Sequence, residues 1–202
     1  MRLIISVVCL VVSGMLAMSA FSGIPVPGKG YSQYVSLQPG SCKSPDRLIL
    51  AHYRARGLAV SECASRVTWR DVPVSLLIVS SDARSWIDVS AGNTIWSGEE
   101  EIVYRQENQF GHFPNIGNSP AEIRMNSAGV TGVIVRVLAQ NPESLSASRV
   151  SGISRLFVFG FVGSDVCFMG FVQDNVSARN RLDSRQLCKR MLKKYRISGP
   201  EQ

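Results

Sequence analysis

The chain has 202 residues, of which 45% are hydrophobic and 18% are charged, and these fractions exclude a chain that is disordered throughout. Once a targeting segment of about 20 residues is set aside, the rest fits one domain with a sizeable core. The formal net charge of +7 is unevenly distributed: residues 23–174 hold 13 basic and 13 acidic side chains, whereas residues 175–202 hold eight basic and two acidic ones. Such a basic segment indicates either a local electrostatic contact or a solvated surface.

The N-terminus begins with one positive charge, Arg2, followed by an apolar run over residues 3–21 and by small residues. This order predicts a secretory signal peptide over residues 1–22, with cleavage after residue 19, 20 or 22. The apolar run is 19 residues long. Because a bilayer is spanned by roughly 20 residues, an uncleaved membrane anchor remains the alternative.

Residues 23–40 are rich in Gly, Pro and Ser, which predicts a linker or an extended arm. A single disulfide-containing α+β domain is expected over residues 41–202. At its start, residues 46–56 suit a short helix and a strand equally well, because their apolar spacing fits both periods.

The pattern typical of strands begins at Val67, and a mainly antiparallel sheet is expected. The connections between the later strands are too short or too polar for crossover helices. Residues 109–120, dense in Gly, Pro and Asn, are expected to form a loop. Single strands are predicted over residues 72–79, 100–106, 121–126, 132–139, 155–163 and 167–173.

Residues 85–97 predict a hairpin with a three-residue loop at 91–93. In that register Asp88 faces Trp96, and Trp86 shares their face of the sheet. Two tryptophans on one face are a candidate aromatic surface for sugar rings. A packing contact inside the fold is the alternative.

The basic C-terminal segment is predicted to form an amphipathic helix that packs on the sheet, beginning near Ser184 or earlier, at Asn175. Its apolar side would carry Leu187, Cys188, Met191, Leu192 and Tyr195. Its basic side would carry Lys189, Arg190, Lys193 and Lys194, which are candidates for contact with an anionic partner.

Four cysteines follow the N-terminal segment, and an even number in an exported chain predicts two disulfides. Four cysteines allow three pairings, but equal separations of 21 residues favour Cys42–Cys63 and Cys167–Cys188. Each pair would close a loop worth about 3 kcal/mol. In this scheme the second disulfide ties the C-terminal helix to the sheet. A zinc site is disfavoured because the chain has no Cys-x-x-Cys pair and only two histidines, and no cofactor is expected.

The catalytic candidates are few, because the chain has neither Gly-x-Ser-x-Gly nor Ser-x-x-Lys. Glu99, Glu100 and Glu101 stand at the start of a predicted strand, where Glu99 and Glu101 would share a face and raise one another's pKa. His112 lies between two phenylalanines in the predicted loop, where it could titrate or bind. A solvated strand edge and a structural loop are the alternatives for these two features.

The leading hypothesis is an exported, periplasmic or secreted, non-enzymatic accessory protein. It would bind a protein or an anionic envelope component through the basic C-terminal helix. Nucleic acid is disfavoured by the export segment and by the scarcity of aromatic residues among the basic ones. One alternative is a small exported hydrolase that uses His112 with a carboxylate of Glu99–Glu101. Another is a structural envelope protein tethered to the membrane by an uncleaved N-terminal segment.

Overall fold

The computed structural model describes residues 30–144, 151–184 and 186–198. The predicted signal peptide or anchor lies outside these residues. In the described part of the chain, no helix has both the length and the hydrophobicity needed to cross a membrane.

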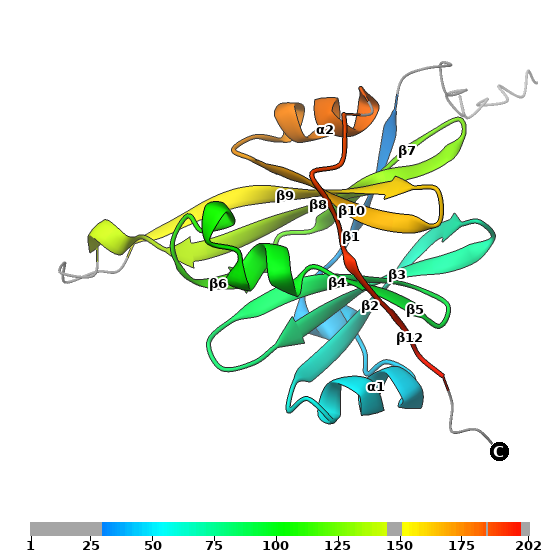
Figure 1. Ribbon diagram of the computed structural model, residues 1–202, viewed down its shortest axis with the longest axis horizontal. Coiled ribbons are helices and arrows are strands. Elements are labelled where there is room, and N and C mark those ends of the chain that lie inside the picture. The colour runs from blue at the N-terminus through cyan, green and yellow to red at the C-terminus, as the bar shows by residue number, and fades with distance from the viewer. Residues whose placement is uncertain (1–29, 145–150, 185, 199–202) are drawn as a thin grey trace, which may run out of the picture.

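The described residues form four layers in the order helix, sheet, sheet, helix (Figure 1). Helix α2 (Asn175–Asp183) covers the outer face of a seven-stranded sheet, and helix α1 (Arg47–Arg54) covers the outer face of a five-stranded sheet. The inner faces of the sheets meet, with the rings of Trp69 and Phe161 4.6 Å apart. The described strand pairs are antiparallel, so the prediction of a mainly antiparallel sheet is confirmed.

The seven-stranded sheet has the order β1-β7-β8-β9-β10-β11, and β6 also pairs with β8. Strands β7 to β10 form the meander that the short connections predict. The strand bounds are β1 (Tyr31–Val35), β6 (His112–Ile116), β7 (Ala121–Asn126), β8 (Gly129–Gln140), β9 (Gly152–Val162), β10 (Asp165–Val172) and β11 (Arg190–Met191).

The five-stranded sheet has the order β12-β5-β4-β3-β2. Its strands are β2 (Ala59–Trp69), β3 (Val72–Ser80), β4 (Ser85–Ala91), β5 (Thr94–Ser97) and β12 (Lys193–Arg196). Single helical turns lie between the strands: η1 (Pro39–Ser41), η2 (Glu100–Tyr104), η3 (Gln106–Asn108) and η4 (Pro142–Ser144).

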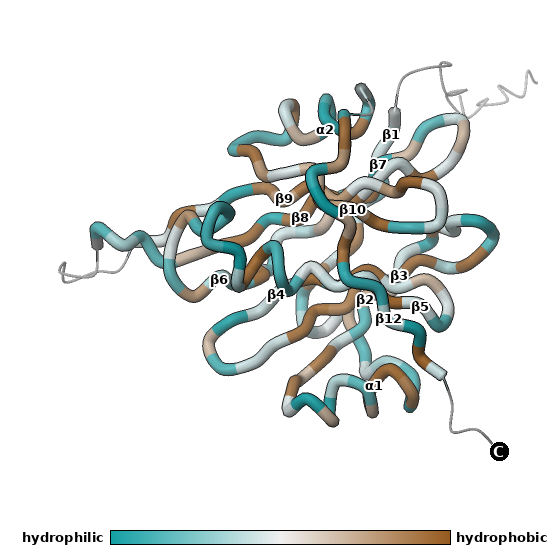
Figure 2. Tube along the Cα trace, viewed as in Figure 1, coloured by the Kyte–Doolittle hydropathy of each residue, from teal (hydrophilic) through white to brown (hydrophobic). Residues whose placement is uncertain are grey.

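Side chains of β8, β9 and β10 alternate between two buried faces of the seven-stranded sheet, which explains why these strands are rich in hydrophobic residues (Figure 2). Phe157 and Phe159 of β9 point into the core between the sheets. Leu156 and Val158, the alternate residues, pack under α2 with Leu182. The helix therefore closes a second, smaller core on the outer face.

Helix α1 resolves the ambiguity of residues 46–56. The Asp46 side chain accepts the backbone N–H groups of Leu48 and Ile49 at 2.8 and 3.0 Å, as an N-cap does. Ile49 and Tyr53, one turn apart, are buried. The cap fixes a helix where the apolar spacing alone also fitted a strand.

The predicted linker or extended arm over residues 23–40 contains a strand in its second half. Residues 31–35 form β1, which pairs with β7 along its whole length. The backbone of a sheet edge offers hydrogen bonds that a polar segment can use whatever its composition. In the same way, β6 occupies part of the expected loop over residues 109–120.

The strand predicted over residues 100–106 is also wrong, because η2 and η3 occupy it. The chain turns out of the sheet at Gly98, whose backbone N–H donates to the Asp88 carboxylate at 2.9 Å. A Cβ atom at this position would collide with the carbonyl oxygen of Ile87, so the turn requires glycine.

The predicted C-terminal amphipathic helix is wrong. Helix α2 begins at Asn175 and ends at Asp183, and β11 and β12 follow it. The backbone N–H groups of Lys189 and Leu192 donate to carbonyl oxygens of β10 at 2.8 and 2.9 Å, and β12 pairs with β5. The C-terminal segment therefore joins one edge of each sheet (Figure 1). Hydrogen bonds to two open sheet edges stabilise the extended conformation more than local helix propensity stabilises a helix.

Candidate functional site

An apolar groove of about 570 Å³ lies on the α2 side of the seven-stranded sheet. This volume lies within the roughly 300–1,000 Å³ of typical ligand sites. None of its lining residues is charged. The β7–β8 turn, the β9–β10 hairpin, the end of α2 and the C-terminal segment supply the main apolar contacts: Val130, Phe161, Met169, Leu182, Leu187 and Met191.

Several of the groove's apolar side chains are exposed. Leu187 is 91% exposed, Met191 54% and Val162 51%. Exposed side chains that gather on one concave surface are typical of a binding site rather than of scattered surface residues.

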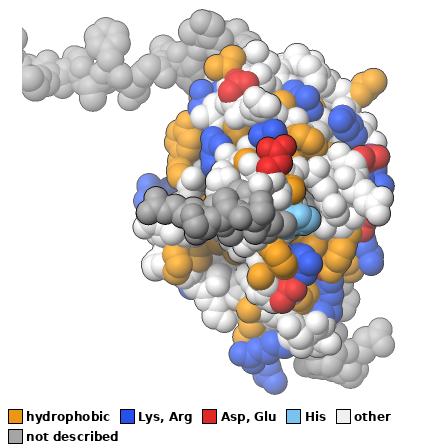
Figure 3. All heavy atoms as spheres, turned by 90° about the vertical axis from the view of Figure 1, so that its left-hand side faces the viewer, with side chains coloured by type: hydrophobic (Ala, Val, Ile, Leu, Met, Phe, Trp, Pro, Cys, Tyr) orange, Lys and Arg blue, Asp and Glu red, His pale blue; other side chains and the backbone are white. Residues whose placement is uncertain are grey.

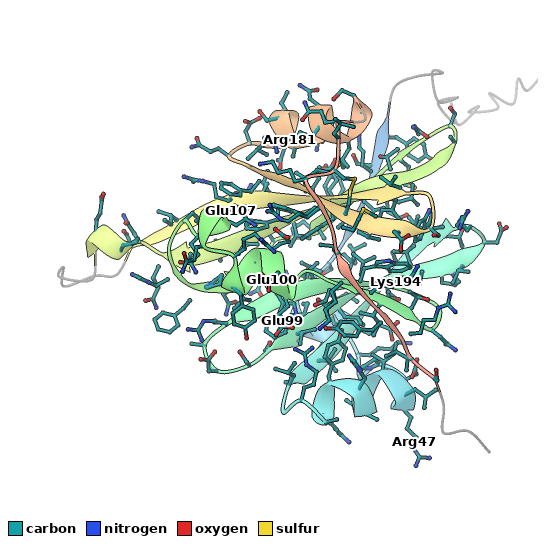
Figure 4. The ribbon with its side chains drawn as sticks, viewed as in Figure 1. Arg47, Glu99, Glu100, Glu107, Arg181 and Lys194 are labelled. Carbon is teal, nitrogen blue, oxygen red and sulfur yellow. A yellow bond between two sulfur atoms is a disulfide. The ribbon has the colours of Figure 1, made fainter. Side chains whose placement is uncertain are left out.

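Two cations flank the groove. The atoms nearest to a Cβ placed at Gly170 belong to the side chains of Arg181 and Lys189, so these two converge at one point of β10. Arg181 (Figure 4) also donates to the carbonyl oxygen of Met169, a groove residue, at 2.8 Å. Within the described parts of the chain, neither cation has a carboxylate at ion-pair distance. The groove therefore has an apolar floor and a positive rim.

The Cys167–Cys188 disulfide forms part of the groove wall. It joins β10 to the segment before β11, with the two Cα atoms 5.7 Å apart. The second disulfide, Cys42–Cys63, lies beside the five-stranded sheet. Both pairs are those that the equal separations favoured, but Cys167–Cys188 fastens an extended segment, rather than a helix, to β10.

The four basic residues proposed for an anionic contact do not share a face. The Arg190 guanidinium binds the buried carboxylate of Glu101, and Lys194 binds Asp165 at 2.7 Å. Lys193 lies on the α1 side of β12, where it lines a separate pocket. Of the four, Lys189 alone flanks the apolar groove.

The three glutamates occupy a helical turn, so Glu99 and Glu101 do not share a strand face. Their carboxylates are bound by arginines, and Arg105 contacts both Glu100 and Glu101. Glu99 pairs with Arg56 at 2.6 Å, Glu100 with Arg105 at 3.2 Å and Glu101 with Arg190 at 2.8 Å. Each of the three carboxylates therefore has an arginine as its charged partner.

His112 is exposed at the start of β6. Figure 3 shows one face of the molecule, on which hydrophobic, basic and acidic side chains are interspersed. The cavity beside His112 measures about 100 Å³ and is lined by Ile102 and Val103 but by none of the three glutamates. No hydrogen bond or ion pair among the described residues joins His112 to these glutamates. The structure does not bring the predicted acid–base pair together.

The two tryptophans form no aromatic surface. The β4–β5 turn has two residues rather than three, so Trp96 pairs with Val89 and Asp88 with Ser97. This one-residue shift places Trp86 and Trp96 on opposite faces of the sheet. They are 1% and 3% exposed, respectively.

Asp88 forms a buried polar cluster between the five-stranded sheet and α1. Its carboxylate accepts the Tyr53 hydroxyl at 2.6 Å, the Ser97 hydroxyl at 2.8 Å and the Gly98 N–H. Burial raises the pKa of Asp88 to about 6, although these hydrogen bonds act in the opposite direction. Because this carboxyl is 1% exposed, it holds α1 on the sheet rather than facing a ligand.

The site residues that the sequence did not indicate are Arg181 and the apolar lining of β8 and β9. Leu187 and Met191 were assigned to the buried side of a helix, whereas they line an open groove. A pattern of exposed apolar residues is visible only once the strand bounds are known.

The fold and groove define a disulfide-bonded, sheet-dominated protein with a concave apolar surface. Comparison with family models, with curated proteins and with solved structures gives no match, so the function is inferred from the site itself.

Proposed function

We propose that this chain is an exported, non-enzymatic protein that binds a lipid with an anionic head group. The acyl chain would lie in the apolar groove, and the head group would face Arg181 and Lys189. The observation that carries the proposal is an uncharged, concave lining beside two cations, Arg181 and Lys189, that form no ion pair with the described residues.

The groove supports an acyl chain because its walls offer aliphatic and thioether side chains. Leu187 and Met191, both largely exposed, would lose their contact with water on binding. Each buried CH₂ group is worth about 0.8 kcal/mol. The methionines, Met169 and Met191, adapt well to a flexible chain.

The rim supports a negative head group. The acid nearest in sequence, Asp183, is already bound by Arg124, whose Nη2 lies 2.6 Å from the carboxylate. Along the part of the chain that the structure describes, no carboxylate lies at ion-pair distance from Arg181 or Lys189. Arginine and lysine near a lipid surface contribute about 1 kcal/mol each toward an anionic head group.

Export is supported by the two disulfides, which persist in oxidising compartments. The predicted targeting segment over residues 1–22 supports it independently. The earlier expectation of an anionic envelope component as partner is thus retained, but at Lys189 and Arg181 rather than along a helix.

The test compares lysophosphatidylglycerol with lysophosphatidylcholine, two probes with the same acyl chain, by calorimetric titration below their micelle-forming concentrations. We expect the anionic lipid to bind more tightly. Lys189→Gln should reduce the preference for the anionic lipid about fivefold. Leu187→Ser should lower the affinity for both lipids.

Arg196→Gln is the matched control, because Arg196 is an exposed cation on β12 that does not line the groove. It should leave both affinities unchanged. The proposal would be overturned if neither lipid binds. It would also be overturned if Lys189→Gln and Arg196→Gln change the affinity for the anionic lipid equally.

A further inference from the structure

A second concavity lies on the α1 side of the five-stranded sheet, whereas the groove lies on the α2 side of the other sheet. It measures about 280 Å³ and lies between α1, the segment after β5, and β12. Figure 4 labels two of its lining residues, Glu99 and Glu100, at the start of η2. We call it the polar pocket. No residue lines both the groove and the polar pocket.

The charges that line the polar pocket cancel. Arg56 and Glu99 form an ion pair of 2.6 Å, and the remaining charges are Glu100 and Lys193. Two positive and two negative side chains leave no net charge to attract an ionic ligand. They do supply interleaved hydrogen-bond donors and acceptors around one small space.

Two tyrosines supply flat surfaces. Tyr104 is 60% exposed although it borders the pocket. The Tyr195 ring is held between the His52 ring, with centroids 5.1 Å apart, and the Lys193 ammonium, 5.1 Å from its centroid. Among the described residues, no hydrogen bond engages either tyrosine hydroxyl or the Lys193 ammonium. The two tyrosine hydroxyls and the Lys193 ammonium can therefore still form hydrogen bonds with a ligand.

The rear wall of the polar pocket is rigid. Ser97 lines it and donates to the buried carboxylate of Asp88, which also accepts the Tyr53 hydroxyl from α1. The Arg56–Glu99 pair ties the end of α1 to the segment after β5. A wall held by buried hydrogen bonds keeps its binding groups in place before a ligand arrives.

We propose that the polar pocket binds a neutral saccharide. A sugar ring has apolar C–H faces that stack on tyrosine, and hydroxyl groups that both donate to carboxylates and accept from arginine and lysine. The pocket lies just below the roughly 300 Å³ at which drug-sized sites begin, so it fits a ligand of monosaccharide size or one terminal ring of a longer glycan. The zero net charge of the lining favours a neutral sugar over a phosphate or a carboxylate.

The test is saturation-transfer difference NMR with glucose, galactose and N-acetylglucosamine, each titrated to obtain Kd. At least one sugar should bind. Tyr104→Ala should weaken it about fivefold through lost stacking, whereas Tyr104→Phe should retain binding within about twofold because the ring remains. Lys193→Gln should also weaken it.

Tyr31→Ala is the matched control, since Tyr31 is an exposed tyrosine on β1 that does not line the polar pocket. It should not change Kd. The proposal is overturned if no sugar binds, or if Tyr104→Ala and Tyr31→Ala have equal effects. Displacement of the sugar by millimolar inorganic phosphate would also overturn it and would assign an anion site instead.

Discussion

The guanidinium of Arg190 holds the buried carboxylate of Glu101 with two parallel hydrogen bonds, Nε to Oε1 at 2.8 Å and Nη2 to Oε2 at 2.9 Å. Glu101 is 3% exposed and comes from η2, whereas Arg190 comes from β11. The pair therefore fastens the C-terminal segment to the middle of the chain at the point where it passes from one sheet to the other. A bidentate arginine–carboxylate pair is among the stronger polar contacts in proteins.

Replacing Arg190 by Met should destabilise the protein by about 2 kcal/mol, because a buried carboxylate loses its main charged partner. The side chain of Asn108, which donates to Glu101 at 2.7 Å, and the nearby Arg105 limit the loss. Urea unfolding followed by tryptophan fluorescence measures it. Arg196→Met, an exposed arginine on β12, is the control and should shift stability by less than about 0.5 kcal/mol.

Asp88 should make stability fall as the pH rises. Burial raises its pKa from 3.8 in the unfolded chain to about 6 in the folded protein, so the folded state binds the proton more tightly. The unfolding free energy of the wild type relative to Asp88→Asn should therefore decrease between pH 4 and pH 7, by up to about 3 kcal/mol.

Asp165→Asn provides a control of opposite sign for the pH series. The hydrogen bond from Lys194 lowers the pKa of Asp165, so its stabilisation is lost as the pH falls. Tyr53→Phe removes a hydrogen bond to the Asp88 carboxylate. It should therefore raise the pKa of Asp88 further, which an NMR titration would measure. A wild-type to Asp88→Asn difference that stays constant from pH 4 to pH 7 would contradict this account.

Gly132 should not tolerate a methyl group. A Cβ at this position of β8 would collide with the carbonyl oxygen of Phe159 and with the Leu182 side chain of α2. Gly132→Ala should therefore cost at least about 2 kcal/mol and lower Tm by about 4–8 °C. Gly152→Ala is the comparison, since its nearest neighbour would lie 3.9 Å away. Equal thermal shifts in the two variants would show that α2 does not pack closely on β8.

Much of the sheet was predictable because the strand pattern depends on local apolar runs. β7 matches its predicted range of residues 121–126, and β3, β8, β9 and β10 lie close to theirs. β3, β8, β9 and β10 are largely buried on both faces, so their hydrophobic runs are long.

The candidate site was not predictable, because it depends on which sheet edge each segment finds. The helical spacing that placed Leu187 and Met191 on one helix face reflects only a local preference for helix. The hydrogen bonds from Lys189 and Leu192 to β10 are made only once that edge exists. Likewise, a two-residue turn at Gly92 rather than a three-residue one moved Trp96 to the opposite face. Single-residue changes of register carry no signature in composition.

The two disulfides offer a test that separates stability from binding. Both close loops with a sequence separation of 21 residues, so the chain-entropy contribution to the free energy of unfolding is the same, about 3 kcal/mol. Replacing either pair of cysteines by alanine should therefore destabilise the protein to a similar degree, as measured by urea unfolding. The loss should be equal because both replacements restore the same loop freedom to the unfolded chain.

Lipid binding should nevertheless respond to one pair alone. Cys188 lines the apolar groove, and its disulfide anchors to β10 the segment that carries Leu187 and Met191. Cys42 and Cys63 do not line the groove. The Cys167→Ala/Cys188→Ala variant should lose affinity for lysophosphatidylglycerol, while Cys42→Ala/Cys63→Ala should retain it at a temperature where circular dichroism shows both variants folded. Equal loss of affinity in the two variants would mean that global loosening, and not the wall formed by Cys188, controls access to the groove.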